Sequence, residues 1–269
     1  GILNFQPAEF AKLALTCFLA SYFTRRYDEV RGKKFSAAKP FIVMGVLGVF
    51  LLAQPDLGST VVLFVITFGM LFIVGANFWQ FILLIGTGIL LFVWLVLSAS
   101  YRLKRFTGFL EPFKDPYGTG FQLTNSLMAF GRGEISGEGL GNSIQKLDYL
   151  PEAHTDFIMA IIGEEFGFIG ILVVVILLGL LIFRAMKIGR ESLMLEQRFR
   201  GFFALGISFW IFFQGFVNLG MALGMLPTKG LTFPLVSYGG SSIIIMSATV
   251  GILLRIDHEN RLQRGGQAR

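Results

Sequence analysis

The sequence predicts an all-α, polytopic membrane protein with seven transmembrane helices. Of its 269 residues, 54% are hydrophobic and 15% are charged, whereas soluble domains hold about 45–50% apolar and about 25% charged residues. The apolar residues lie in long blocks, and the single cysteine, Cys17, has no partner for an internal disulfide. This composition excludes a soluble enzyme, a disulfide scaffold and a disordered chain.

Seven apolar stretches come close to the roughly 20 residues that a membrane-spanning helix needs. They are residues 10–24, 41–54, 59–76, 78–98, 156–183, 201–225 and 237–254. The first two are short, so we expect their ends to include polar residues. The whole chain, 1–269, is predicted to form one membrane domain. It contains a large loop at 99–155 and ends in a tail at 255–269.

The basic residues alternate with the helices and predict the orientation. Segment 24–39 holds six basic and two acidic residues, 184–200 holds five and two, and 255–269 holds four and two, whereas 99–155 holds six of each. Because cytoplasmic loops are enriched in Lys and Arg, the three basic segments are predicted to be cytoplasmic and the large loop extracytoplasmic. The net charge of +6 therefore reflects topology, and no nucleic-acid partner is expected.

The large loop is predicted to be an ordered cap, because it is rich in aromatic residues and disordered segments are poor in them. Segments 121–130 and 143–150 are predicted to be short amphipathic helices. Between them, 131–141 contains five glycines and is predicted to be a turn-rich hinge.

Ionisable residues in membrane segments are functional suspects, and here they gather at the predicted outer ends of the helices. Glu9 and Lys12 open the first helix three residues apart, so they either pair structurally or serve a site. Asp56 precedes the third helix and is either a helix cap or a functional acid.

Asp156 is predicted to open the fifth helix, where an acid suits the helix dipole. As a cap alone, Thr155 would serve at a lower desolvation cost, which favours a functional role for Asp156. Of Glu164 and Glu165, two turns further along, only one is expected to face inward. Glu165 is slightly favoured, because small residues line the face that Asp156 begins.

Cations on the predicted outer side are candidate phosphate ligands, and contact with anionic lipid headgroups is the alternative for each. We single out Arg132, Lys146 and Lys229, the last because it is the only charge in a loop bounded by two prolines. Ser237 and Ser241 belong to a run of small residues predicted to open the last helix, where free N–H groups favour anions.

Five ordered motifs resemble those of the SEDS proteins (shape, elongation, division and sporulation). They are Gln-Pro-Ala-Glu at 6–9, Gln-Pro-Asp-Leu-Gly-Ser at 54–59, Pro-Glu-Ala-His-Thr-Asp at 151–156, Pro-Thr-Lys-Gly at 227–230 and Ser-Tyr-Gly-Gly-Ser-Ser at 237–242. The third and fourth are most similar to the division branch of the family and its sporulation relative. The resemblance implies ten helices, of which the first three would precede Gly1. Because the chain also lacks a starting Met, we expect an N-terminally truncated sequence.

The resemblance further implies a peptidoglycan glycosyltransferase that uses lipid II, a disaccharide pentapeptide linked to undecaprenyl pyrophosphate. Asp156 would be catalytic, as a general base or as a metal ligand, and Glu9, Lys12 and Asp56 would shape the substrate cavity. A divalent cation, Mg²⁺ or Mn²⁺, would support the reaction. A lipid-facing groove would admit the undecaprenyl tail.

The implied partners are a class B penicillin-binding protein that supplies the transpeptidase, and other divisome proteins. The implied location is the bacterial cytoplasmic membrane at the division septum.

A lipid II transporter or flippase is the main competing interpretation, and a non-catalytic scaffold is the third. Transporters bind substrate near the membrane midplane between broken helices. The charges here lie towards one side only, and no proline or glycine is predicted to interrupt matching helices. Both observations favour the enzyme.

Overall fold

The computed structural model describes residues 6–32, 38–54, 56–76, 78–98, 108–228 and 230–267. Every regular element in these ranges is helical. The α-helices are α1 (Pro7–Arg25), α2 (Tyr27–Gly32), α3 (Ala38–Ala53), α4 (Leu57–Val74), α5 (Phe78–Leu97), α7 (Phe121–Gly133), α8 (Ile158–Met194), α9 (Arg198–Ala222) and α10 (Gly240–Gln267). Two short turns, the 3₁₀-helical η1 (Pro112–Lys114) and the π-helical η2 (Gln145–Tyr149), complete the set.

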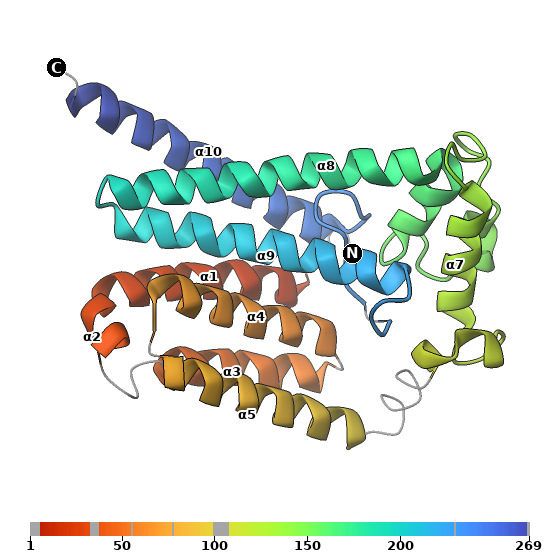
Figure 1. Cartoon of the computed structure of the whole chain (residues 1–269), viewed down its shortest axis with the longest axis horizontal. Coiled ribbons are helices and arrows are strands. Elements are labelled where there is room, and N and C mark those ends of the chain that lie inside the picture. The colour runs from red at the N-terminus through yellow and green to blue at the C-terminus, as the bar shows by residue number, and fades with distance from the viewer. Residues whose placement is uncertain are drawn as a thin grey trace. The chain divides into compact units, whose positions relative to one another are not determined.

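All seven predicted long helices are present, as α1, α3, α4, α5, α8, α9 and α10 (Figure 1). Their ends differ from the predicted ends, because polar residues join the helices where ion pairs or caps support them. The short α2 was not predicted. Of the two short helices expected in the cap, the first is confirmed as α7. The second is only the five-residue turn η2, whose residues Leu147 and Asp148 depart from helical backbone angles.

Among the residues that the structure describes, four helices, α4, α8, α9 and α10, are long and apolar enough to cross a membrane. The apolar helix α3 and the stretch Phe81–Leu91 of α5 are shorter. The chain is therefore a polytopic, all-helical membrane protein, and the count of seven crossings stays a prediction.

The chain divides into two compact units. Unit 1 comprises Gly1–Ile85, Gly179–Phe213 and Gly240–Arg269, and unit 2 comprises Gly86–Leu178 and Gln214–Gly239. The predicted site residues of the first helices belong to unit 1, and Asp156 belongs to unit 2. The prediction of one membrane domain over the whole chain stays a prediction.

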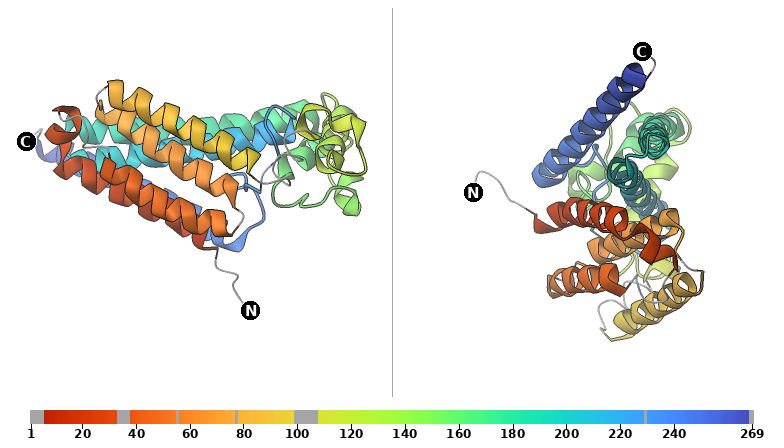
Figure 2. Two further views of the ribbon diagram at one scale, coloured as in Figure 1. Left: turned by 90° about the horizontal axis from the view of Figure 1, so that it is seen from below. Right: turned by 90° about the vertical axis from the view of Figure 1, so that its left-hand side faces the viewer.

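Unit 1 is built around α1, which packs against α3, α4 and α10. The views in Figure 2 agree that α1, α3 and α4 lie side by side. Glycines allow the closest approaches: a Cβ on Gly69 of α4 would meet the ring of Phe209 of α9, and one on Gly206 of α9 would meet Met70 of α4 and Thr16 of α1. This use of small residues is typical of helices packed in a membrane.

The charged end of unit 1 is held by ion pairs between helices. Arg184 of α8 pairs with Asp257 of α10 at 3.0 Å, and Arg200 of α9 pairs with Glu259 of α10 at 2.9 Å. Asp257 also pairs with Arg261 one turn later, at 2.8 Å. These contacts explain why α10 continues through the segment that was predicted to be a tail.

Unit 2 has a small apolar core that joins the cap to the membrane helices. Its buried members are Ala129, Leu150, Ala153, Phe157, Ala160, Ile161 and Ala222. The hydroxyl of Ser126 on α7 donates to the carbonyl of Ala222 at the end of α9, at 2.8 Å. The cap is therefore ordered over the part that the structure describes, as its aromatic content predicted.

Helix α8 is broken at Gly167, whose backbone has φ 64° and ψ −162°. The segment after α7 fills the break: Glu138 and Gly139 donate to the carbonyls of Glu164 and Glu165, both at 3.0 Å, and Phe168 donates to the carbonyl of Glu134 at 2.9 Å. A glycine therefore interrupts one of the long helices, and the neighbouring chain satisfies the interrupted backbone groups.

We expect Gly167→Ala to lower the stability of the protein by about 1–3 kcal/mol, because only glycine adopts this backbone conformation without strain. A Cβ there would also collide with the backbone of Ile135 and Gly137. Thermal unfolding in detergent measures the effect. Gly179→Ala, on the same helix with open space around it, is the control and should be neutral or slightly stabilising. Equal unfolding temperatures for the two variants would contradict the explanation.

Candidate active site

In unit 1, Glu9 and Lys12 form a buried ion pair on the first turns of α1. The Lys12 Nζ donates to Glu9 Oε1 at 2.7 Å, and neither side chain is more than 4% exposed. Lys12 also lies 5.5 Å from the ring centroid of Trp210 on α9. The other carboxylate oxygen, Glu9 Oε2, is buried without a hydrogen-bond partner among the described residues. The predicted pairing is confirmed.

Asp56 is the N-cap of α4, and its Oδ1 accepts a hydrogen bond from Ser59 N at 2.9 Å. The capping alternative for Asp56 is therefore confirmed. Its charge also acts on Lys12, so one carboxylate both caps a helix and belongs to the electrostatic surroundings of the buried pair.

Ser241 lies on the first turn of α10, which begins at Gly240 and not at Ser237 as predicted. Its hydroxyl accepts a hydrogen bond from the backbone N–H of Gln6 at 2.9 Å. The start of α10 is thereby tied to the residue before α1, within unit 1.

In unit 2, Asp156 lies in a turn before α8, which begins at Ile158. The prediction that Asp156 opens the helix is wrong by two residues, because the backbone carbonyls of the turn bond to other elements. The Asp156 side chain is half-buried. A Cβ on Gly230 would lie 3.3 Å from its Oδ2, so the carboxylate packs against the loop between α9 and α10.

Three consecutive carbonyls of this turn accept hydrogen bonds from elements distant in the sequence. His154 O accepts from the backbone N–H of Tyr238 at 2.9 Å, Thr155 O from the hydroxyl of Ser237, and Asp156 O from the side-chain amide of Asn218 at 2.8 Å. The backbone of the turn is therefore held in place by these three hydrogen bonds, which fixes the position from which the Asp156 side chain projects.

Ser237 is buried and bridges two loops. Its hydroxyl donates to Thr155 O and accepts from the backbone N–H of Phe233 at 2.6 Å. The anion-binding role predicted for Ser237 stays a prediction, and the structure gives its hydroxyl a bridging role.

Glu164 is a fully buried carboxylate that organises the cap. Its two oxygens accept hydrogen bonds from Arg132 Nη1 at 3.3 Å, the hydroxyl of Ser143, Ile144 N at 3.1 Å and Gln145 N at 3.2 Å. A buried charge needs this number of donors to offset its lost hydration. Glu164 therefore fixes the start of η2 against α8.

Glu165 is also buried and pairs with Lys146 of η2. The expectation that only one of the two glutamates faces inward is wrong, because the cap segment from Arg132 to Lys146 supplies polar partners to both carboxylates. Glu164 accepts from an arginine, a serine and two backbone N–H groups, and Glu165 accepts from a lysine and from cap backbone groups.

The predicted phosphate ligands therefore have protein partners where the structure describes them. Arg132 pairs with Glu164 and, at 3.7 Å, with Glu138, and its side chain is 38% exposed. Lys146, which pairs with Glu165, is 24% exposed. Lys229 lies outside the described residues.

The surface of the cap carries a local ion pair near η1. Lys114 donates to Glu111 at 2.8 Å, and this hydrogen bond holds the pKa of the Glu111 carboxyl below its ordinary value. Next to it, exposed Asp115 accepts from the backbone N–H of Thr119 at 2.8 Å. Glu111 and Asp115 therefore stabilise local turns of the cap, and they belong to a different part of the sequence from the Asp156 turn.

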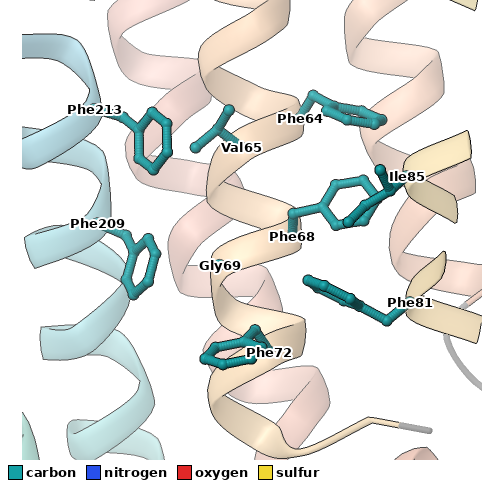
Figure 3. Close-up of a pocket in the computed structure, with 9 residues that line it drawn as sticks. All are labelled: Phe64, Val65, Phe68, Gly69, Phe72, Phe81, Ile85, Phe209 and Phe213. Atoms are coloured by element: carbon teal, nitrogen blue, oxygen red, sulfur yellow. The ribbon is translucent and has the colours of Figure 1, made fainter. Parts of the chain in front are cut away.

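Unit 1 also contains an apolar cavity of about 240 Å³ between α4, the start of α5, and α9 (Figure 3). It is lined by Phe64, Val65, Phe68, Gly69, Phe72, Phe81, Ile85, Phe209 and Phe213. The ring of Phe209 packs directly against the backbone of Gly69, where a Cβ would collide with it. All nine lining residues are apolar.

A metal site built from protein groups alone is not found in the parts that the structure describes, where no three His, Cys, Asp or Glu side chains are grouped for it. Asp156 therefore offers a single carboxylate. That donor fits a Mg²⁺-like ion that takes most of its oxygen ligands from water and from a substrate phosphate.

Sequence reasoning missed Asn218 and Gln214, two fully buried polar residues of α9. Gln214 donates to the carbonyl and the hydroxyl oxygen of Thr232, at 2.9 and 3.2 Å. Their spacing of four residues in an otherwise apolar helix was the available signal, because polar amides inside membrane helices need partners. The prediction of functional residues in the membrane helices used charge alone, and these amides carry none.

Fold and site together define a polytopic helical membrane protein that holds an accessible carboxylate in a braced turn outside its long helices. The family model of the FtsW, RodA and SpoVE proteins, described as "Cell cycle protein", matches residues 1–262. The chain therefore belongs to this family, the SEDS proteins.

Its relatives include a Haemophilus influenzae protein 88% identical over 269 residues and a Pasteurella multocida protein 84% identical over 268. Each is named "Probable peptidoglycan glycosyltransferase FtsW", and each alignment covers 100% of this chain and 68% of the relative. A protein of the same name from Escherichia coli O157:H7 is 57% identical over 264 residues, 98% of this chain and 64% of that protein. The predicted division branch is confirmed.

Two solved structures resemble the fold. One, described as "Structural coordination of polymerization and crosslinking by a peptidoglycan synthase complex", matches with a TM-score of 0.78 at 30% identity over 97% of this chain and 72% of that chain. The other, the Thermus thermophilus rod shape determining protein RodA, matches with a TM-score of 0.65 at 28% identity over 97% and 68%.

We expect Glu164→Gln to loosen the start of η2, because the amide nitrogen of Gln cannot accept from the donors that surround this position. A buried donor left without a partner costs about 1–3 kcal/mol. Hydrogen exchange at the amides of Ile144 and Gln145 should become faster. Glu165→Gln is the control, because its remaining oxygen still accepts from Lys146. Equal exchange in both variants would show that Glu164 does not organise η2.

We expect Lys12→Met to destabilise the protein by about 3–5 kcal/mol, because it leaves the Glu9 carboxylate buried without its cation. The double variant Glu9→Gln/Lys12→Met should recover most of that loss, since it removes both charges. A thermal-unfolding series of the single and double variants measures the difference. Additive losses would argue against a coupled buried pair.

Proposed function

We propose that this chain forms the catalytic membrane part of a peptidoglycan glycosyltransferase, which polymerises lipid II into glycan strands at the outer face of the cytoplasmic membrane. Family membership and relatives above 80% identity with the name of that activity support the proposal. We further infer seven membrane crossings, with the basic segments cytoplasmic and the cap outside.

The placement of Asp156 carries the proposal. The carboxylate is half-buried, belongs to the predicted outer side, and stands on a turn whose backbone is held by hydrogen bonds from α9 and the loop before α10. A general base needs this combination of access and fixed position.

The proposed reaction joins two lipid-linked sugars. The 4-hydroxyl of the GlcNAc of one substrate attacks the anomeric carbon of the growing chain, forming the new glycosidic bond. The bond from that carbon to the pyrophosphate oxygen breaks, and undecaprenyl pyrophosphate leaves. Asp156 accepts the proton of the attacking hydroxyl.

The leaving group carries negative charge and needs cationic partners. If Asp156 is a metal ligand instead of the base, its carboxylate would hold a divalent cation, Mg²⁺ or Mn²⁺, which would supply positive charge for the leaving pyrophosphate. Lys229 is the proposed side-chain contact, because Arg132 and Lys146 already have carboxylate partners.

The apolar cavity of unit 1 is the proposed hydrocarbon surface for part of the undecaprenyl tail, since its lining has no polar side chain. Glu9, Lys12 and Asp56 are proposed to set the charge of the substrate cavity. Their tight pairing indicates an electrostatic role rather than proton transfer.

The proposed partner is a class B penicillin-binding protein that crosslinks the strands. The similarity to a chain from a peptidoglycan synthase complex supports this partnership. We also propose assembly with other divisome proteins at the septum, in keeping with the FtsW relatives.

A lipid II transporter is the second candidate, and the break in α8 is the observation in its favour, because transporters use discontinuous helices. In this chain, however, the carbonyls of Glu164 and Glu165 at the break bond to the cap segment. They do not line a substrate path, which favours the enzyme.

We expect Asp156→Asn to reduce polymerisation of lipid II by at least about 100-fold, the lower range for loss of a general base, with unchanged thermal stability. The assay uses the natural full-length protein with its transpeptidase partner, lipid II and Mg²⁺, and glycan ladders on a gel. Asp115→Asn, an exposed carboxylate of the same cap, is the control and should retain full activity.

The variant also separates the two roles of Asp156. Recovery of the Asp156→Asn activity at high Mn²⁺ would indicate a metal ligand, and no recovery would indicate the base. Full polymerisation by the variant would contradict both. Lipid II crossing liposome membranes, with no ladder from wild type, would favour the transporter.

A further inference from the structure

Asn218 of α9 joins the two loops that meet at Asp156. The residue is fully buried, and its side-chain Nδ2 donates to the carbonyl of Asp156 at 2.8 Å and to the carbonyl of Leu231 at 2.5 Å. The two carbonyls belong to segments 75 residues apart in the chain. A single neutral nitrogen with two hydrogens, which only Asn and Gln side chains supply, is needed for both bonds.

The orientation of the amide is fixed by this contact. A flipped Asn218 would place its oxygen against two carbonyl oxygens, which have no hydrogen to share. The oxygen Oδ1 therefore points away from both carbonyls. It is buried and has no hydrogen-bond partner in the described parts of the chain.

An unsatisfied buried acceptor is rare and costs stability. An apolar residue of the same size would avoid that cost if the position served only to fill the core. The retained amide therefore indicates that tying the two carbonyls together is the purpose of the position. Ser237 also ties the two loops together, because it donates to Thr155 O and accepts from Phe233 N, but neither bond reaches Asp156 itself. The amide nitrogen of Gln214 bonds to Thr232.

We propose that Asn218 is a positioning residue, which sets the place of the Asp156 carboxylate relative to the loop that contains Leu231. Gly230, next to Leu231, lies against Asp156 Oδ2, where even a Cβ would be only 3.3 Å away. A small shift between the two loops would therefore move the carboxylate. Asn218 acts through the backbone of Asp156 and does not touch the reacting atoms. This role rests on the proposed function.

The test compares Asn218→Leu with Asn260→Leu in the natural full-length protein with its transpeptidase partner. Asn260 on α10 is also buried, and its amide donates to Ile188 O at 3.3 Å and Ser192 Oγ at 2.8 Å. It belongs to unit 1 and makes no bond to the Asp156 turn. Both variants lose a buried amide of the same kind, so their stability losses should be similar.

We expect Asn218→Leu to lower the kcat of lipid II polymerisation about 100-fold, the effect of displacing a catalytic group by about 1 Å. The KM of Asn218→Leu should stay within about threefold of wild type, and its unfolding temperature should fall no further than that of Asn260→Leu. The kcat of Asn260→Leu should stay within about threefold of wild type. Asn218→Ser keeps one donor, and its kcat should lie between Asn218→Leu and wild type.

Equal kcat for Asn218→Leu and Asn260→Leu would overturn the proposal, as would a rise in KM at unchanged kcat. If Asn218→Leu does not accumulate in cells, the kcat of Asn218→Ser is compared with that of Asn260→Ser. Equal kcat values for these two variants would likewise overturn the proposal. A wild-type protein that forms no glycan would refute the proposed function itself. Active wild type with an active Asn218→Leu would refute only the role of Asn218.

Discussion

Hydrocarbon offers no hydrogen bonds, so every polar group that this chain takes into the membrane has to find its partner within the protein. This constraint explains the features that apolar patterning does not. The break in α8 exists because the segment after α7 supplies the missing donors and acceptors. Glu164 is tolerated in full burial because four donors converge on it. Lys12 is tolerated because Glu9 lies one turn away.

The two units provide partners for their buried polar groups with different sets of contacts. Unit 1 pairs opposite charges: Glu9 with Lys12 within one helix, and arginines with acids between α8, α9 and α10. Unit 2 also has ion pairs, of Glu164 with Arg132 and of Glu165 with Lys146. In addition, it joins loops by binding backbone carbonyls with side-chain amides and hydroxyls, as Asn218, Gln214 and Ser237 do. A charge network tolerates motion of long side chains, whereas amide contacts to carbonyls fix backbone positions. Contacts between side-chain amides and backbone carbonyls therefore suit a turn that has to hold a carboxylate in a fixed place.

The long helices were predictable because apolar length is a property of consecutive residues, and the aromatic content of the cap indicated its order. The pairing of Glu9 with Lys12 was also local, since three residues separate them. The break at Gly167 was not predictable in this way, because glycine is common in membrane helices and its partner segment lies 30 residues earlier in the sequence. For the same reason, the sequence alone did not predict that Glu164 and Glu165 are both buried or that Asn218 bridges two loops. Predicting either feature requires knowing which loops meet in space.

Helix α10 has 28 residues, which at 1.5 Å per residue gives about 42 Å, while the hydrocarbon core is about 30 Å thick. Its last turns carry the charges that pair with α8 and α9, so roughly 12 Å of helix extends beyond the apolar layer as a rigid post. The helix that begins beside Gln6 therefore connects the start of α1, through its whole length, to the charged turns of α8 and α9.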